Sequence, residues 1–177
     1  LYENLRWKTI SPQGFREEML AYLPNESNSL LFSMALSYLG DCQRIFPSDS
    51  CPLEEALWKI VTTNPVSQHR LQAFRLYRSI ADSEEAVQRL YTLWQERKAP
   101  KDCTLSESDY IGLSYMLAMH LPEKADKIIA TQLSRIQNPD RKKEYQFISP
   151  SVSPRKAERD SVFASLLIAG NRRVEPW

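Results

Sequence analysis

The two histidines of the sequence, His69 and His120, are the residues that could bind a catalytic metal ion. A zinc peptidase of the H-E-x-x-H type needs that spacing on a helix, because it places two imidazoles on one face, and a downstream glutamate completes the site. His69 is followed by Arg70 and His120 by Leu121, so neither begins the pattern. We therefore predict that both are ordinary helix residues and that this chain binds no metal or other cofactor.

No side chain stands in a sequence context typical of a catalytic nucleophile. No serine occurs in a G-x-S-x-G motif, and Asp102 beside Cys103 is expected to raise the pKa of the thiol and so to weaken it. Cys42, Cys51 and Cys103 lack the spacing of a zinc site and are expected to be buried thiols, although Cys42 and Cys51 could pair across a turn. The 4 glycines are scattered, which excludes a glycine-rich phosphate-binding loop.

Paired carboxylates recur near the expected N-termini of helices, at Glu17-Glu18, Glu54-Glu55 and Glu84-Glu85. Negative charge at these positions is stabilised by the helix dipole, and this structural explanation suffices. Carboxylates from two helices could still meet in a deep polar pocket with perturbed pKa values. An enzyme with such a site is therefore a third, least supported hypothesis.

Basic residues cluster at Arg141-Lys142-Lys143, followed by the aromatic residues Tyr145 and Phe147. Nucleic-acid binding requires Arg and Lys clustered among aromatic residues, and the formal net charge of +1 gives the chain no strong field. No run reaches the roughly 18 apolar residues of a membrane-spanning helix. We therefore expect no nucleic acid or membrane as a partner, and the simplest interpretation of the cluster is a solvated helix face.

Apolar residues recur with helical spacing along the whole chain, and no stretch shows the alternation typical of a strand. We predict an all-α fold: an α-α superhelix (a HEAT-like or ARM-like solenoid) of about eight to ten antiparallel helices, in a single helical-repeat domain over residues 1–177. The first three helices are expected over residues 1–10, 12–23 and 27–46. The third carries the widest apolar stripe, which we expect to face the core: Leu30, Leu31, Met34, Ala35, Tyr38 and Leu39.

Polar residues in front of several helices match the pattern of N-terminal caps. The predicted caps are Ser11 before Pro12, Asp82 with Glu85, Ser106 with Asp109, and Asn138 before Pro139.

The last helix is expected to begin at Pro154 and to bury an apolar face that includes Phe163 and Leu167. Serine precedes proline at Ser149-Pro150 and Ser153-Pro154, and both serines are expected to lie outside the α region. Arg159 and Asp160 could form a local ion pair that fixes the bend.

A set of residues near the C-terminus combines a basic patch, Phe-Ile-Ser-Pro, Arg-Asp, an aromatic residue and a closing Glu-Pro-Trp. They are Phe147, Ile148, Ser149, Pro150, Ser153, Arg159, Asp160, Phe163, Arg173, Glu175, Pro176 and Trp177. This pattern resembles the C-terminal helical region of zinc-dependent aminopeptidases, the gluzincin metallopeptidases with an H-E-x-x-H signature. The opening Leu1-Tyr2-Glu3-Asn4 is similar to the start of that region. The resemblance therefore spans the whole chain, but its specific residues lie at the two ends, and the residues between them show only a general helical pattern.

The resemblance implies a HEAT-like superhelix that is the non-catalytic C-terminal helical domain of a zinc metallo-aminopeptidase-like hydrolase. Zinc, the general-base glutamate and the amine-binding motif would belong to a separate catalytic domain. Expected partners are that catalytic domain, in the same polypeptide, and the peptide substrates whose access the helical domain shapes. Candidates for contacting a substrate's C-terminal carboxylate or acidic groups of the catalytic domain are Arg141, Lys142, Lys143, Arg159 and Arg173.

The ends of the sequence favour a fragment of a longer peptidase. The start at Leu1-Tyr2-Glu3 has no initiator methionine or signal pattern, and Pro176-Trp177 resembles the beginning of a further helix. The alternative function is a free-standing α-solenoid that binds a partner protein in its concave groove.

Overall fold

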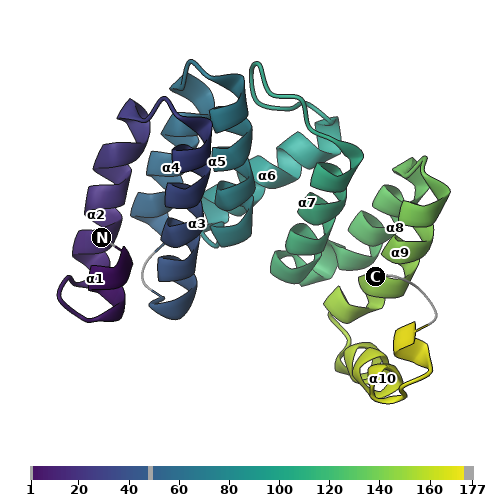
Figure 1. Cartoon of the computed structure of the whole chain (residues 1–177). Helices are drawn as coiled ribbons and strands as arrows, with labels where there is room; N and C mark the ends of the chain where they lie inside the picture. The colour runs from purple at the N-terminus through teal and green to yellow at the C-terminus, as the bar shows by residue number, and fades with distance from the viewer. Residues whose placement is uncertain (1, 48–49, 174–177) are drawn as a thin grey trace. The chain divides into compact units, whose positions relative to one another are not determined.

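A computed structural model describes residues 2–47 and 50–173 of the chain (Figure 1). Within these residues the chain forms ten α-helices, four short 3₁₀ turns and no strand. The all-α fold predicted from the spacing of the apolar residues is therefore confirmed. The chain divides into two compact units, Leu1–Leu105 (unit 1) and Ser106–Trp177 (unit 2). The single domain predicted over residues 1–177 stays a prediction.

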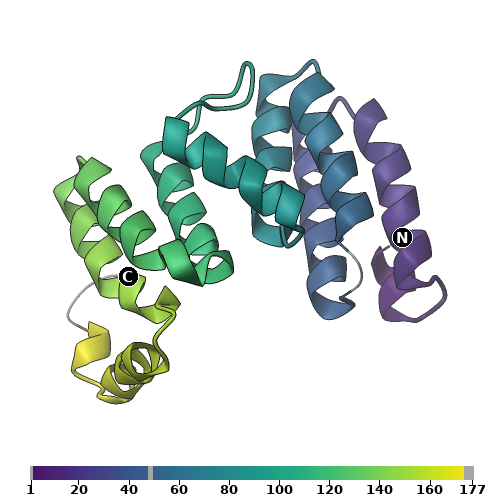
Figure 2. The same ribbon diagram turned by 180° about the vertical axis from the view of Figure 1, so that it is seen from behind.

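The described part of unit 1 contains six α-helices and one 3₁₀ turn. They are α1 (Tyr2–Arg6), α2 (Pro12–Tyr22), η1 (Leu23–Asn25), α3 (Ser29–Ile45), α4 (Cys51–Thr63), α5 (Ser67–Ile80) and α6 (Glu84–Glu96). Helix α5 packs against both α3 and α4, and the view from behind shows α4 and α5 side by side (Figure 2). Helix α1 ends earlier than predicted, because Lys8 adopts a left-handed conformation (φ 59°) that a right-handed helix cannot include.

Two junctions in unit 1 test the predicted caps. The Ser11 hydroxyl accepts the Gly14 N–H at 3.0 Å, which confirms Ser11 as the cap of α2. The predicted cap Asp82 is wrong by one residue, because Ser83 caps α6 and accepts the Ala86 N–H. The reason lies outside the local sequence: a buried carboxylate from α4 accepts the N–H groups of Asp82 and Ser83 and fixes the junction one residue later.

Helix α3 buries a different face from the one predicted. Ala35 and Leu39 are buried as expected, whereas Leu30, Leu31 and Met34 are 69%, 46% and 42% exposed. Apolar residues surround most of this helix, so their spacing alone could not identify the buried side. The side that faces the core consists of Phe32, Ala35, Leu36, Leu39 and Cys42.

Helix α6 is tied to α4 and α5 by Arg89. Its guanidinium donates a hydrogen bond to the Tyr77 hydroxyl at 2.8 Å and lies 4.7 Å from the ring centroid of Trp58. A cation over an indole face contributes about 0.5–2 kcal/mol, depending on how far it is desolvated. Together with the burial of Leu90 and Trp94, this contact holds α6 on the rest of unit 1.

The described part of unit 2 contains four α-helices and three 3₁₀ turns. They are α7 (Glu107–His120), η2 (Pro122–Lys124), α8 (Ala125–Arg135), α9 (Pro139–Ile148), η3 (Ser149–Val152), α10 (Lys156–Leu167) and η4 (Asn171–Arg173). Helix α7 packs against α8, and α9 contacts α8. The core of this unit includes Leu113, Leu117, Ile128, Ile136 and Tyr145.

Two predicted caps in unit 2 are confirmed. Ser106 and Asp109 form a reciprocal capping box at the start of α7, in which each side chain accepts the backbone N–H of the other residue. The Asn138 side chain accepts N–H groups from Asp140 and Arg141 at the start of α9. Both caps are decided by neighbouring residues, so the sequence alone predicts them.

The last helix of the described residues differs from the prediction in its start and its burial. Ser153 is extended, as expected before Pro154, but Ser149 has helical angles (φ −55°, ψ −33°) and opens η3. Helix α10 begins at Lys156 and has no buried residue among those described. Phe163 and Leu167 are 67% and 65% exposed, so the predicted buried face of this helix is wrong.

Candidate functional site

The basic cluster lies at the beginning of α9, where Arg141, Lys142 and Lys143 are all exposed. Arg141 pairs with Glu107 of α7 at 3.4 Å, so its charge serves a contact within unit 2. The Gln137 N–H also donates to Glu107, at 2.8 Å, which joins the start of α9 to the start of α7. Within the part of the chain that the structure describes, Lys142 and Lys143 form no ion pair.

Arg159 fixes the bend between η3 and α10, although not with the predicted partner. Its guanidinium donates to the Ser153 carbonyl at 2.6 Å, while Asp160 pairs with Lys156 at 2.6 Å. The predicted Arg159–Asp160 ion pair is therefore wrong, because residues four apart lie on one helix face whereas adjacent residues diverge. The side chain of the remaining basic candidate, Arg173, lies outside the described residues, as do Glu175, Pro176 and Trp177.

Each histidine takes part in ordinary helix structure. His69 is fully buried in α5, lies 2.9 Å from the Ser29 hydroxyl and stacks on Phe32 at 4.0 Å between ring centroids. Burial lowers the pKa of His69, and the carboxylate of Glu26 opposes this only in part. His120 is exposed at the end of α7. Among the described residues, no three metal-ligating side chains come together.

The three cysteines are present as thiols in different environments: Cys42 is buried, Cys51 is exposed and Cys103 is half-buried. Burial is the main cause of the raised pKa of Cys103. Asp102 adds to it, as predicted, and Arg70 opposes it. A thiol with a raised pKa is a poor nucleophile at neutral pH.

Glu54 is the buried carboxylate of unit 1, with 3% of its surface exposed. It accepts the N–H of Asp82 at 2.8 Å, the N–H of Ser83 at 3.2 Å and the Ser83 hydroxyl. Burial alone would raise the pKa of Glu54, but its hydrogen bonds, led by the Ser83 hydroxyl, outweigh burial and hold the pKa below its ordinary value. Because these donors come from the α5–α6 junction, the carboxylate joins helices rather than facing a substrate.

Tyr145 is the corresponding buried polar residue of unit 2. The Ser114 hydroxyl donates to the Ile111 carbonyl at 2.7 Å, so its oxygen is left to accept the Tyr145 hydroxyl, 2.9 Å away. Tyr145 stacks on Tyr115 at 5.0 Å between ring centroids. Burial raises the pKa of Tyr145 to about 12, so this hydroxyl stays protonated at neutral pH and joins α9 to α7.

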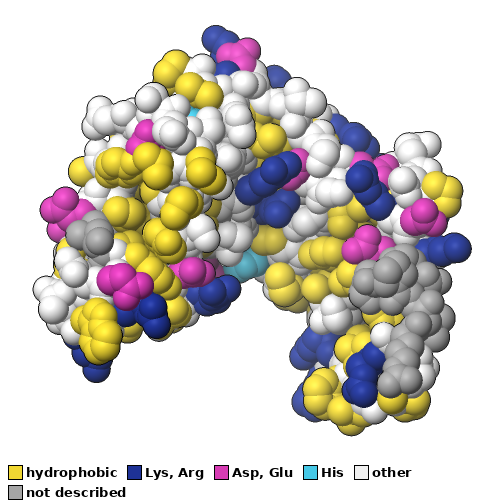
Figure 3. Space-filling view, viewed as in Figure 1, with side chains coloured by type: hydrophobic (Ala, Val, Ile, Leu, Met, Phe, Trp, Pro, Cys, Tyr) yellow, Lys and Arg dark blue, Asp and Glu magenta, His cyan; other side chains and the backbone are white. Residues whose placement is uncertain are grey.

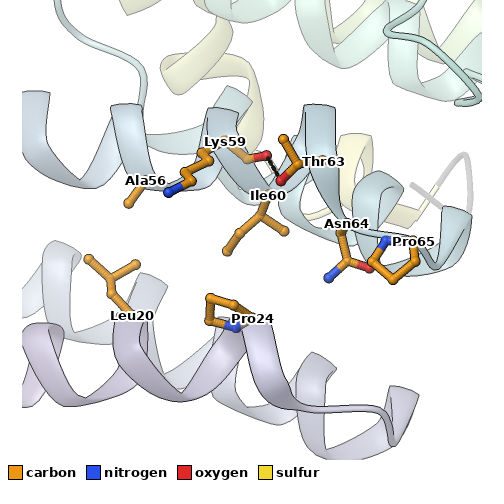
Figure 4. A pocket seen from close by; sticks show the side chains of 8 residues that line it. All are labelled: Leu20, Pro24, Ala56, Lys59, Ile60, Thr63, Asn64 and Pro65. Carbon is orange, nitrogen blue, oxygen red and sulfur yellow. Dashed lines mark hydrogen bonds between the residues drawn. The ribbon is translucent and has the colours of Figure 1, made fainter.

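An apolar groove of about 320 Å³ lies in unit 1 between α4 and the end of α2 (Figure 4). Leu20 and Pro24 line one side, and Ala56 and Ile60 line the other. Its volume is at the lower end of the range of about 300–1,000 Å³ that is typical of small-molecule sites. No sequence pattern identified this groove, because it joins residues from helices that are distant along the chain.

The exposed apolar face of α3, made of Leu30, Leu31, Met34 and Ile45, is a second surface feature of unit 1. Ile45 is 56% exposed, and the other three are the residues that were predicted to be buried. Figure 3 shows hydrophobic side chains gathered over α2 and α3 on the visible face. Leu30, Leu31 and Met34 lie in the first turns of α3, and Ile45 is the last residue of the helix.

None of the described helices has the length and apolar character required to cross a bilayer. Comparisons with protein-family models, curated proteins and solved structures gave no match to the chain.

Proposed function

We propose that this chain is a non-catalytic helical domain of a zinc metallo-aminopeptidase-like protein. In this role it packs on a catalytic domain in the same polypeptide and shapes the access of peptide substrates. Zinc and the groups that activate water belong to the catalytic domain. Residues 1–177 contribute surface and rigidity.

The observation that carries the proposal is the exposed apolar face of α3. Leu30 is 69% exposed and Met34 is 42% exposed, so a partner that covers these side chains would be stabilised by removing them from water. Each large apolar side chain contributes about 1.5–3 kcal/mol when fully buried. Such a face is available for contact with another protein body, here the catalytic domain of the same polypeptide.

The buried polar side chains of the described residues support a structural role. Glu54 serves the α5–α6 junction, Tyr145 joins α9 to α7, and His69 contacts Ser29 and Phe32 of α3. In each case, the hydrogen-bonding group is directed to a neighbouring helix. These contacts between helices are typical of a scaffold, although the buried Nδ1 of His69 has no hydrogen-bond partner among the described residues.

We further infer that successive helices form antiparallel pairs stacked as an α-α superhelix. Helices α4 and α5 pack on each other across the short link from Thr63 to Ser67, as do α7 and α8 across η2. Short connections favour antiparallel neighbours.

Lys142 and Lys143 are the basic candidates best placed to meet an acidic partner. Arg141 and Arg159 are engaged within unit 2, whereas the two lysines are exposed and without an ion pair in the described residues. We propose that they face a peptide carboxylate or acidic groups of the catalytic domain.

The alternative function is a free-standing α-solenoid that binds another protein. The open face of α3 favours this alternative as much as it favours a peptidase domain. The reading frame upstream of Leu1 in genomic DNA distinguishes the two. Continuation of that frame into a helix with H-E-x-x-H and a downstream glutamate is the expected result. A frame that starts at or close to Leu1 would contradict the proposal and favour the interaction module.

A further inference from the structure

The groove between α2 and α4 has an apolar floor with two nitrogen donors on the α4 side. Leu20, Pro24, Ala56 and Ile60 supply the apolar contact surface. Lys59 of α4 and Asn64, which directly follows α4, belong to the same lining and stand on either side of Ile60 (Figure 4). A pocket that is mostly apolar and has a few polar groups at its edge is the usual architecture of a small-molecule site.

A backbone N–H group fixes which way the side-chain amide of Asn64 is turned. Its side-chain oxygen accepts the Val66 N–H at 2.9 Å, so the amide nitrogen is the atom left for another partner. Figure 4 shows this nitrogen turned toward the groove beside Pro24. Asn64 is 7% exposed, so its orientation is held by its surroundings.

Lys59 supplies the charge of the groove. It is exposed and forms no ion pair among the described residues. The described residues that line the groove include this one cation and no carboxylate. The groove therefore complements a molecule that has an apolar body and a negative end.

The position of Lys59 near the C-terminal end of α4 disfavours a doubly charged anion more than a singly charged one. The C-terminal end of α4 lies at Thr63, and a helix C-terminus carries partial negative charge. A doubly charged phosphate is disfavoured near that end, and phosphate sites generally use arginine clusters or helix N-termini. A carboxylate with a single charge matches the one ammonium group of the groove.

We propose that this groove binds a small amphiphilic carboxylate of the fatty-acid type. Its chain would lie between Leu20 and Pro24 on one side and Ala56 and Ile60 on the other. Its carboxylate would pair with Lys59 at one end of the groove, and Asn64, on the other side of Ile60, would border the apolar chain. The site is contained within unit 1 and does not depend on the proposed peptidase role.

The test is a titration of the full chain followed by backbone amide NMR, with octanoate, octylamine and octan-1-ol as probes. These three molecules share one chain and differ in the charge of the head group. Octanoate is expected to shift the amide signals of Lys59, Ile60 and Asn64 and to bind roughly fivefold more tightly than octan-1-ol, as a partly exposed ion pair allows. Octylamine is expected to bind more weakly than octan-1-ol.

Two variants and one control locate the site. K59Q should reduce octanoate affinity to that of octan-1-ol, and A56F should weaken all three probes by filling the groove. K127Q removes another exposed lysine, in the first turn of α8, and should leave octanoate binding unchanged. The proposal is overturned if octanoate leaves these amides unshifted, if octylamine binds as well as octanoate, or if K59Q retains the native preference.

Discussion

At the scale of single residues, Glu54 is the side chain on which the α5–α6 junction depends. Its carboxylate accepts two backbone N–H groups and the Ser83 hydroxyl inside unit 1. E54Q removes the negative charge and replaces the oxygen that accepts the Ser83 hydroxyl by an amide donor, so we expect it to lower the free energy of unfolding by roughly 1–3 kcal/mol. Urea denaturation at pH 7 measures this. The matched control is E55Q, an exposed neighbour on the same helix, which should change stability little.

The same residue predicts a pH dependence. The pKa of Glu54 is lower in the folded chain than its ordinary value of 4.5, so folding favours the ionised form. This stabilisation is present above pH 4.5 and is lost as the pH falls through the folded pKa. The stability difference between the native chain and E54Q should therefore shrink on acidification. A difference that stays constant from pH 7 down to acid-induced unfolding would contradict this role for the carboxylate.

Tyr145 is the equivalent test in unit 2. Y145F removes the donor to the Ser114 hydroxyl while keeping the ring that stacks on Tyr115. We expect a loss of roughly 0.5–1.5 kcal/mol, because a buried hydrogen bond disappears and the cavity is small. Y22F, at a residue that is 40% exposed, provides the comparison in the same denaturation experiment. An equal effect of the two variants would show that the buried hydroxyl pair contributes nothing.

The residue-level prediction of the site from the sequence was limited by long-range contacts. The sequence alone shows that neither histidine begins the H-E-x-x-H pattern. The sequence predicts Glu54 only as a negative charge near the N-terminus of its helix, because nothing local marks Ser83, the cap of α6, as its partner. The groove at Lys59 was missed for the same reason, since Leu20 and Pro24 face it from a separate segment.

At the scale of elements, the capping box of α7 is the clearest local determinant. Ser106 and Asp109 satisfy each other's backbone N–H groups. S106A should cost about 1 kcal/mol of stability, within a usual range of about 0.5–2 kcal/mol for such caps. S108A, at an exposed position in the first turn of the same helix, should change stability by much less. Thermal unfolding followed by circular dichroism compares the two, and equal midpoints would argue against the cap.

The sequence predicts the start of a helix where the residues that cap it are its immediate neighbours. Caps at Ser11, Ser106 and Asn138 were correct, since each is decided by neighbouring residues. The buried face of α3 was not predictable, because apolar side chains occupy both its core side and its open side. Ser149 also entered a 3₁₀ turn despite the proline that follows it, which shows that the preference for extended backbone before proline can be overridden.

At the scale of the whole molecule, the open face of α3 makes a prediction about stability and association. L30Q changes a residue that is 69% exposed and should alter the free energy of unfolding by no more than about 0.5 kcal/mol. L36A changes a residue of the same helix that is 5% exposed and should cost about 2–5 kcal/mol. Sedimentation velocity should also show less self-association for L30Q than for the native chain. Comparable destabilisation by the two variants would place Leu30 in the core.

The most direct test of the central claim is an assay for peptidase activity in the isolated chain. The claim is that residues 1–177 support and cover a catalytic domain and carry no reactive group of their own. The measurement is hydrolysis of leucyl-p-nitroanilide by the purified chain with added zinc, against a blank containing the same buffer and zinc. The account predicts a rate equal to that of the blank. Hydrolysis that requires zinc, and that disappears when His69 or His120 is replaced, would contradict it.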